Sequence, residues 1–474
     1  MPCESGSEGE GGAGPTTESG SGRGDPDTEL LVVPDPVVMS KRYPLHYSVF
    51  QGDIKRVSAL LRTCDVTEQD VHGNTALHLA VMLGKKECVH LLLAHGAPVR
   101  VKNAAGWNPL AEAISYGDRQ TITSLLRKLK QQSRQTLEEK RPELLQALQE
   151  LGDFYLELKW DFHSWVPLVS RILPSDTCRI YKSGVCIRMD TTLVDFSDMR
   201  WQRGDLSFIF NGHLRPNVSL VVLDNELKVF QRIRCEETEM EIEEEVDILM
   251  SSDVVAAQMS TKAISFQRAQ TGWVFREDKT ESVGTFSADY YHIGGISLES
   301  RKRREHLSAE DLKKNKELLD SLSRGFFVEN SCDQPCVRRE SIQPPPPSPV
   351  SWDEYVTAPS GRWPHLGRPM VVKETRKSLK ATVAMSEEFP IRLDRLLDVL
   401  EIIAPFKHFL KLREFVQLKL PSGFPVKIEI PVLPTITAKI TFQDFQARDT
   451  QFYPQSFFQI PNNFKEDPNR FPDL

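Results

Sequence analysis

The sequence predicts a multidomain α+β protein, with an N-terminal solenoid of helical repeats followed by a mixed, largely antiparallel β region that also holds helices. A repeat supports the first part, because three similar elements recur at intervals of 32 and 33 residues. A change of period supports the second part, because from about residue 177 apolar and polar residues alternate as they do along strands. The length of 474 residues agrees with several folded units at roughly 150 residues per domain.

The chain opens with a segment that has little to bury. Residues 1–29 are rich in Gly, Ser, Glu, Pro and Thr, and such a composition does not offset the entropy of ordering. The short apolar stretch 30–38 is interrupted by Pro34 and Pro36 and is expected to be extended. We therefore predict a disordered tail over residues 1–40.

Residues 41–130 contain the repeat, which three independent markers define in one register near 33 residues. The middle unit, residues 72–80, closely resembles the ankyrin consensus, so each unit is expected to be a β-turn followed by two helices. A glycine ends the first helix of each unit, because glycine tolerates a left-handed cap, and about three repeats bury a continuous stack. The markers are Pro44-Leu45-His46, Ala76-Leu77-His78 and Pro109-Leu110-Ala111; Gly52, Gly84 and Gly117; and Leu60-Leu61, Leu92-Leu93 and Leu125-Leu126.

Residues 131–170 are predicted to form a helical connector. Apolar residues spaced by four and three positions lie on one face of a helix, and Pro142 suits its first turn. This stripe is expected to pack on the rest of the protein, and the alternative is a helix that lies on a membrane surface or on a partner. The stripe consists of Leu144, Leu148, Leu151, Tyr155 and Leu158.

Residues 171–325 are predicted to form a central α+β region. Segments such as 179–182, 185–189 and 206–210 alternate in polarity and are bounded by turn residues, as in antiparallel hairpins. Among them, residues 236–247 hold eight carboxylates in twelve positions. We expect this acidic stretch to be a solvated loop, and the alternative is that it binds cations or basic partners.

Residues 326–360 are predicted to form a proline-rich linker, because Pro344–Pro347 has polyproline character and few neighbouring residues are apolar. Residues 361–474 recover core character as a C-terminal α+β part, with strands expected at 379–385, 426–430 and 435–442. The sequence leaves open whether this part completes the central sheet or stands alone.

The charge balance argues against one class of partner. The 59 basic and 66 acidic residues give a net charge of −7, whereas a general nucleic-acid binder carries a basic patch, so no nucleic acid is expected. No apolar run reaches the roughly 20 residues that span a bilayer. The eight cysteines form no dense framework, which fits a reducing compartment.

The sequence holds no recognisable setting for catalysis, so we predict no enzyme activity, no catalytic residue and no cofactor. A Gly-rich phosphate loop, a Gly-x-Ser-x-Gly elbow and a His-Glu-x-x-His motif are all absent. Cys332 and Cys336 are four positions apart without a second pair, so no metal site is expected. His46 and His78 fall at the starts of repeat helices, where we expect them to hydrogen-bond backbone groups.

Two charged motifs are candidates for regulation. Ser341 follows Arg338 and Arg339 in an expected loop and is a possible phosphosite, since phosphate would add about −1.5 to −2 charge beside the arginines. The basic run 301–304 is expected to begin a solvated helix, and the alternative is contact with anionic lipid or an acidic partner.

Four stretches carry a family resemblance: residues 72–84, 150–158 with 165–168, 203–210 and 404–409. They resemble the ankyrin repeat domain 13 family over about residues 41–474, and the ending 470–474 resembles its C-type branch. This resemblance implies a non-enzymatic chaperone or quality-control factor, peripherally attached to the cytosolic side of the endoplasmic reticulum membrane. It would hold newly made G-protein-coupled receptors and regulate their export. The other branches continue into ubiquitin-interacting motifs, so the alternative is a ubiquitin-dependent endocytic adaptor, but ubiquitin is not an expected partner of this chain.

Ankyrin stacks bind partners with the tips of their turns and with their first helices. We therefore expect partner-binding residues at two tips, His72 and Asn74 in one and Lys102, Asn103 and Trp107 in the next. Trp107 is the favoured anchor, because aromatic residues often dominate interface energy. The alternative is that Trp107 only packs between neighbouring tips.

Overall fold

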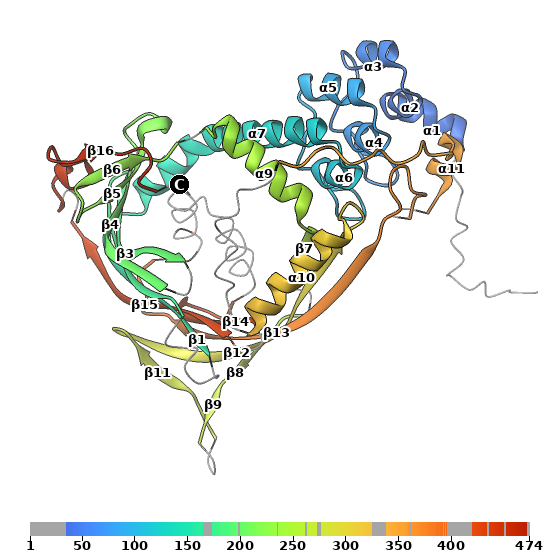
Figure 1. Ribbon diagram of the computed structural model, residues 1–474. Coiled ribbons are helices and arrows are strands. Elements are labelled where there is room, and N and C mark those ends of the chain that lie inside the picture. The colour runs from blue at the N-terminus through green and yellow to red at the C-terminus, as the bar shows by residue number, and fades with distance from the viewer. Residues whose placement is uncertain are drawn as a thin grey trace, which may run out of the picture.

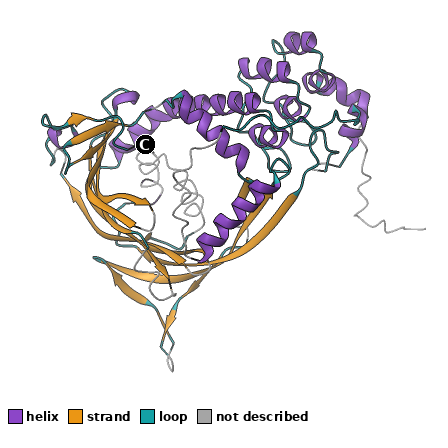
Figure 2. Cartoon of the chain, viewed as in Figure 1, coloured by secondary structure: helices purple, strands orange, loops and turns teal. Residues whose placement is uncertain are grey.

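The helices and the strands occupy different parts of the molecule in the computed structural model. Figure 2 shows the short helices gathered on one side, longer helices reaching away from them, and the strands curving round from the far end to meet them. None of the helices among the described residues combines the length and the apolar character that crossing a membrane requires. The structure describes residues 35–164, 173–197, 200–234, 236–260, 263–272, 276–324, 338–359, 362–391, 393, 395, 420–433, 436–449 and 452–471.

The predicted repeats are confirmed as three stacked helix pairs. Each first helix ends at or next to a glycine with positive φ, 75° at Gly52, 66° at Gly84 and 88° at Gly117, as the left-handed cap predicts. The equivalent apolar side chains of the three units share one core. The pairs are α2 (Pro44–Gln51) with α3 (Ile54–Leu60), α4 (Ala76–Met82) with α5 (Lys86–Ala94), and α6 (Pro109–Tyr116) with α7 (Arg119–Glu150).

A further helix, α1 (Pro36–Arg42), begins inside the predicted disordered tail. That prediction, and the extended conformation expected for residues 30–38, are wrong from Pro36 onward; residues 1–34 lie outside the described residues. Pro36 starts the helix instead of breaking one, because its fixed φ suits the first turn. Asp35 caps the helix by accepting a hydrogen bond from the Val37 N–H at 2.9 Å, and Met39 packs against the repeat core.

Helix α7 runs through the border that was predicted near residue 130. Pro142 lies well inside this helix rather than in its first turn, at an exposed position where water can reach the carbonyl that lacks a partner. Gly152, with φ of 76°, then turns the chain, and Tyr155 and Leu158 belong to strand β1 (Asp153–Ser164). The predicted helical stripe is therefore wrong beyond Leu151, because the spacing of four and three happens to continue into a strand.

The strands of the described residues form a 14-stranded sheet that is antiparallel except where β16 pairs with β6. Its order is β11-β12-β13-β14-β15-β1-β2-β3-β4-β5-β6-β16, with β7 and β8 also pairing with β12, and β9 pairs with β10 in a separate ribbon. The bounds after β1 are β2 (Ser175–Ser183), β3 (Cys186–Ser197), β4 (Arg200–Asn211), β5 (Leu220–Asp224), β6 (Val229–Arg232), β7 (Val254–Ser260), β8 (Ser265–Arg268), β9 (Gln270–Thr271), β10 (Glu277–Asp278), β11 (Thr280–Val283), β12 (Phe286–Arg303), β13 (Val372–Ser386), β14 (Phe424–Leu433), β15 (Ile436–Arg448) and β16 (Lys465–Glu466).

The C-terminal part completes the central sheet, which resolves the question that the sequence left open. Strand β15 pairs with β1 from Asp153↔Arg448 to Ser164↔Ile436, and β13 pairs with β12. Figure 1 shows the sheet curving from β6 past β1 to β12 and β13, which rise toward the repeats, while α7 spans from the repeats to the opposite end of the sheet.

The acidic stretch forms helix α9 (Glu239–Ser251) instead of the expected solvated loop. Thr238 and Glu241 close a capping box at its start, and the acidic first turn suits the positive end of the helix dipole. The carboxylates face basic residues of α7: Lys130 pairs with Glu237 at 2.9 Å and with Glu245 at 2.6 Å. The acidic stretch therefore pairs with a helix from another part of the chain.

Residues 338–359 and 362–370, which we call the strap, pack against the repeats instead of forming the predicted linker. The Ile342 N–H donates to the Gly117 carbonyl at 2.9 Å. Helix α11 (Trp352–Thr357) buries Trp352 and Tyr355, and these residues belong to the repeat core. The apolar residues here are few, but aromatic side chains bury a large area each. The strap is followed by β13 and preceded by helix α10 (Ala309–Arg324), and residues 326–337 of the predicted linker lie outside the described residues.

Candidate functional site

The tip of the second repeat, Gln69–Thr75, is a closed turn that we call finger 2. Its two ends pair through an isolated bridge between Gln69 and Thr75. The Asp70 carboxylate accepts the backbone N–H groups of His72 and Asn74, each at 2.9 Å. Gly73 has φ of 71°, and a Cβ there would lie 2.8 Å from the Ala104 nitrogen. Finger 2 therefore needs Asp70 and Gly73 for its shape.

The next tip, Lys102–Trp107, is finger 3 and is bonded directly to finger 2. The side-chain oxygen of Asn103 accepts a hydrogen bond from the Trp107 N–H at 3.0 Å. The side-chain amide nitrogen of Asn103 donates to the Asn74 side-chain oxygen at 2.9 Å. The Ala104 N–H donates to the His72 carbonyl, also at 2.9 Å. The polar groups of Asn74 and Asn103 thus connect the fingers to each other.

Buried histidines hold both fingers from the helix side, as the sequence predicted. The His78 Nδ1 accepts the Thr75 N–H at 3.0 Å, so its Nε2 carries the proton and donates to the Trp107 carbonyl at 3.1 Å. His46 Nε2 bonds the Asn74 carbonyl in the same way at 3.0 Å. Burial lowers the pKa of His78 to about 4 and also lowers the pKa of His46. Both rings therefore stay neutral near pH 7.

Helix α11 of the strap covers finger 2. The Tyr355 hydroxyl donates to the Asp70 carboxylate at 2.5 Å and accepts from the Asn74 amide at 2.9 Å. His72 Nε2 donates to the Tyr355 carbonyl at 2.7 Å. Trp352 packs edge-on against Tyr47 and Phe50 of α2, with ring centroids 5.4 Å apart in each case. Both polar and aromatic groups of the repeats are thus occupied by the strap.

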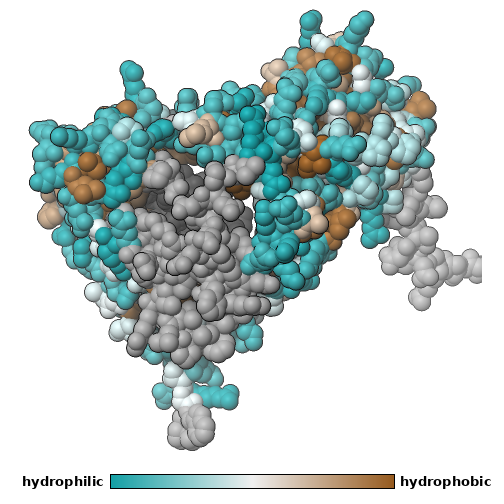
Figure 3. Space-filling view, in the orientation of Figure 1, coloured by the Kyte–Doolittle hydropathy of each residue, from teal (hydrophilic) through white to brown (hydrophobic). Residues whose placement is uncertain are grey.

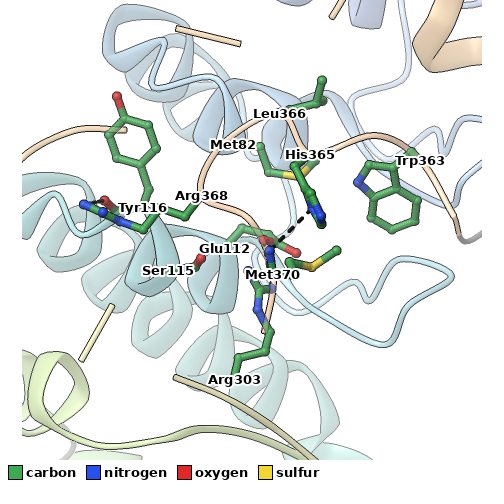
Figure 4. A pocket seen from close by; sticks show the side chains of 11 residues that line it. Met82, Glu112, Ser115, Tyr116, Arg303, Trp363, His365, Leu366, Arg368 and Met370 are labelled. Atoms are coloured by element: carbon green, nitrogen blue, oxygen red, sulfur yellow. Dashed lines mark hydrogen bonds and ion pairs between the residues drawn. The ribbon is translucent and has the colours of Figure 1, made fainter. Parts of the chain in front are cut away.

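The end of strand β12 covers finger 3. The Arg303 guanidinium lies 5.0 Å from the centroid of the Trp107 ring and is itself buried. It pairs with Glu112 of α6 at 2.9 Å and with Glu305 at 2.6 Å. Figure 4 shows Arg303 and Glu112 pointing toward each other beside the strap residues His365 and Met370. This cover is built on a buried ion triad.

The structure corrects the expectation that the predicted partner-binding residues face solvent. His72, Asn74, Asn103 and Trp107 are buried, because α11 and β12 lie over the fingers, and only Lys102 of the predicted set is exposed. Trp107 cannot anchor a partner in this conformation. The sequence reasoning missed Trp352 and Tyr355, although the pattern Ser351-Trp-Asp-Glu354 is a capping box that signals a helix in the proline-rich region.

The two regulatory motifs are both engaged within the chain. Ser341 is exposed, and its hydroxyl accepts the Arg119 N–H at the start of α7 at 3.0 Å. The basic run ends strand β12 instead of starting a helix: Arg304 pairs with Asp253 at 2.8 Å and Arg303 is buried. It is therefore not a free basic patch for lipid or for an acidic partner, because carboxylates of the chain take its charges.

A groove and the potential metal ligands of the described residues bear on whether the chain carries a chemical site. A groove of about 520 Å³ lies between the repeats and the strap, and its described lining, which includes Phe50, Leu83 and Pro345–Pro347, contains no histidine, cysteine or acidic residue. No group of three or more His, Cys, Asp or Glu that could hold a metal ion occurs in the described part of the chain. Cys332 and Cys336 lie outside it. Figure 3 shows a mostly hydrophilic viewed face, with hydrophobic patches over the repeats and over the β6 end of the sheet.

Comparisons with known proteins account for both parts of this arrangement. A model of ankyrin repeats in three copies matches residues 40–136, and a model named ANKRD13 C-terminal matches residues 188–471. The chain belongs to the ankyrin repeat domain 13 family. Human ankyrin repeat domain-containing protein 13C is 64% identical to it over 94% of this chain and 82% of that protein. The zebrafish (Danio rerio) 13C protein is 63% identical over 97% of this chain and 90% of its own length.

The family also contains more distant relatives. Mouse ankyrin repeat domain-containing protein 13B is 36% identical over 86% of this chain and 68% of its own length. This member of the family is thus an ankyrin-repeat protein whose repeats, a protein-interaction module, are joined to the family's C-terminal region by shared packing.

Proposed function

We propose that this chain is a non-enzymatic chaperone or quality-control factor for newly made G-protein-coupled receptors. It acts peripherally at the cytosolic face of the endoplasmic reticulum and regulates receptor export. The observation that carries the proposal is the similarity to 13C relatives, at 63–66% identity, across both the repeats and the C-terminal region. The family resemblance implies a role in receptor biogenesis for proteins that combine these repeats with this C-terminal region.

The architecture supports a binding role for the repeats in this proposal. A cytosolic receptor segment needs a shaped surface with hydrogen-bonding and aromatic groups. Finger 2 has Asp70 and Asn74, and helix α2 has Tyr47 and Phe50, all of which the strap contacts in this structure. Attachment to the membrane comes from the bound receptor in this account, since the basic run 301–304 is paired within the chain. Nucleic acid and ubiquitin are not partners in it.

Proximity labelling in intact cells tests the proposal. The full chain, fused to a labelling enzyme, is expected to label membrane proteins of the reticulum, newly made receptors among them, and to leave endosomal proteins at background. Labelling concentrated on endosomal receptors would contradict it.

A binding experiment with polyubiquitin separates the chaperone from the endocytic adaptor. Immobilised polyubiquitin chains are expected to retain no more of this chain than beads without ubiquitin. Retention comparable to that of a 13B relative measured side by side would favour the adaptor.

A further inference from the structure

Helix α11 sits on the repeats as a bound ligand would. Its hydrogen bonds with finger 2 join residues 281 to 285 positions apart in the sequence, and they use side chains and one carbonyl rather than a shared strand ladder. Tyr355 is fully buried there, and Trp352 fills the space between Tyr47 and Phe50. The surface that it covers is the one that ankyrin repeats generally offer to partners.

The pocket for Tyr355 selects the neutral phenol. Its hydroxyl donates to Asp70 at 2.5 Å and accepts from Asn74 at 2.9 Å, so both of its hydrogen-bonding roles are used. Asp70, His72 and Asn74 are themselves buried. Desolvation and the nearby Asp70 carboxylate raise the pKa of Tyr355 well above its ordinary value, which keeps the donor proton in place.

A phosphate on this oxygen does not fit the same pocket. It would place a charge of about −1.5 to −2 next to the buried Asp70 carboxylate. It would also remove the hydroxyl proton that Asp70 accepts. The side chains around the hydroxyl are held by their own bonds within the fingers, since Asn74 also bonds Asn103 and Asp70 also bonds two N–H groups of the turn. The pocket therefore discriminates against phosphotyrosine.

The cover can leave without unfolding what lies beneath it. Helix α11 has 6 residues, which is too short to be stable by itself, and the rest of the strap described beside it has no strand or other helix. The turn bonds of finger 2 and its bonds to finger 3 do not involve α11, so they do not depend on it.

We propose that finger 2 is a peptide-binding site that reads an unphosphorylated tyrosine, and that Tyr355 is its resident ligand. A tyrosine-bearing segment of a client protein enters when α11 leaves, and phosphorylation of either tyrosine excludes that tyrosine from the pocket. The proposed function supplies only the kind of client protein in this proposal. The recognition of tyrosine follows from Asp70, His72 and Asn74.

Peptide binding to the full chain tests the site with purified components. The probe is a fluorescent synthetic peptide with the sequence of residues 348–359. The protein that it is expected to bind is the full chain carrying Trp352→Ala and Tyr355→Ala, two substitutions that empty the pocket. Fluorescence anisotropy is expected to show saturable binding to this variant and at least tenfold weaker binding to the unchanged chain. The same peptide phosphorylated on its tyrosine is expected to bind at least tenfold more weakly.

Controls keep the test decisive. The exposed Asp353→Ala variant retains both aromatic anchors and is expected to exclude the probe as the unchanged chain does. Circular dichroism and a cooperative thermal transition verify that the emptied variant is folded; if it is not, Tyr355→Phe takes its place and is expected to admit more probe than the unchanged chain. Absence of binding to a folded, emptied variant, or equal binding of the phosphorylated peptide, would overturn the proposal. Because no receptor is used, these outcomes are independent of the test by proximity labelling.

Discussion

Fingers 2 and 3 are neighbouring turns of one repeat array, yet the chain covers them in different ways. Finger 3 lies under Arg303 at the end of β12, a strand bonded on both sides within the 14-stranded sheet. Finger 2 lies under α11, which is attached by the side chains of Tyr355 and Trp352 and by one carbonyl. The first cover is part of the protein's framework, and the second is a separable ligand.

The chemistry of each cover matches that difference. Arg303, Glu112 and Glu305 form a buried ion triad, in which loss of Arg303 leaves two carboxylates without a cation. The Tyr355 hydroxyl bonds the Asp70 carboxylate and the neutral Asn74 amide, so its loss leaves one buried acceptor and one buried donor without a partner. Substitutions at finger 3 should therefore destabilise the whole protein, whereas those at finger 2 should mainly release the strap.

The largest effect is expected for Arg303→Met. Removing the guanidinium leaves the buried Glu112 and Glu305 carboxylates facing each other, at a cost of about 3–5 kcal/mol. Urea unfolding of the full chain measures the loss, and adding Glu112→Gln and Glu305→Gln should restore part of it. The matched control is Arg376→Met, because Arg376 lies on the adjacent strand β13 with an exposed side chain and should change stability by less than about 0.5 kcal/mol. Equal losses for the two arginines would remove the triad from the account.

Trp352→Ala should cost about 3 kcal/mol, as large-to-small changes of a buried aromatic residue do. This loss is expected to appear locally, as faster amide exchange over residues 351–358, while the exchange of β1 and β12 stays unchanged. The exposed Phe452→Ala is the control and should leave both regions as they are. A uniform rise of exchange over the sheet would show that the strap is not separable.

Acid should weaken both fingers, because each is held by a buried neutral histidine whose pKa is lowered by burial. The folded pKa of His78 is about 4, below the usual 6.5, so the unfolded chain binds the proton first as the pH falls. Its stabilising effect is complete above about pH 6.5 and is lost progressively down to about pH 4, at a cost of about 3 kcal/mol. Urea unfolding at pH 7 and pH 5 measures this loss of stability. His78→Gln should reduce the difference in stability between the two pH values, whereas His95→Gln, at an exposed position, should not.

Tyr355→Phe is expected to have the smallest effect of the four, about 1–2 kcal/mol, because it leaves the Asp70 carboxylate without its donor while keeping the ring. In the Asp70→Asn background the same change should cost less, because the amide is a weaker partner. A double-mutant cycle of the two substitutions measures the coupling. Zero coupling would mean that the hydroxyl does not hold α11 through Asp70.

The repeats could be predicted from the sequence because their contacts are local and recur. Gly52, Gly84 and Gly117 each adopt the positive φ that ends a helix, so a single residue in the sequence marks each helix end. His46 and His78 bond backbone groups about 28 residues ahead, which is a constant distance within the array. The regular spacing therefore carries the structure.

The sheet order and the strap could not be predicted in that way. The pairing of Asp153 with Arg448 depends on partners that no local pattern marks, although the alternation indicated the individual strands. For the strap, the small number of apolar residues predicted a linker. Tyr355 is buried because it fits finger 2, which is distant in the sequence. The predicted site residues lie at the correct fingers, but only the structure shows that the chain itself covers four of them.

Hydrogen exchange of the unchanged full chain tests the central claim most directly. If α11 rests on finger 2, the amides of residues 352–357 should be protected, and Tyr355→Ala should release them while Asp353→Ala does not. The amides of His72 and Asn74 should stay protected in both variants, because they bond Asp70 within the turn. Exchange of residues 352–357 at the rate of an unstructured peptide in the unchanged chain would contradict the account.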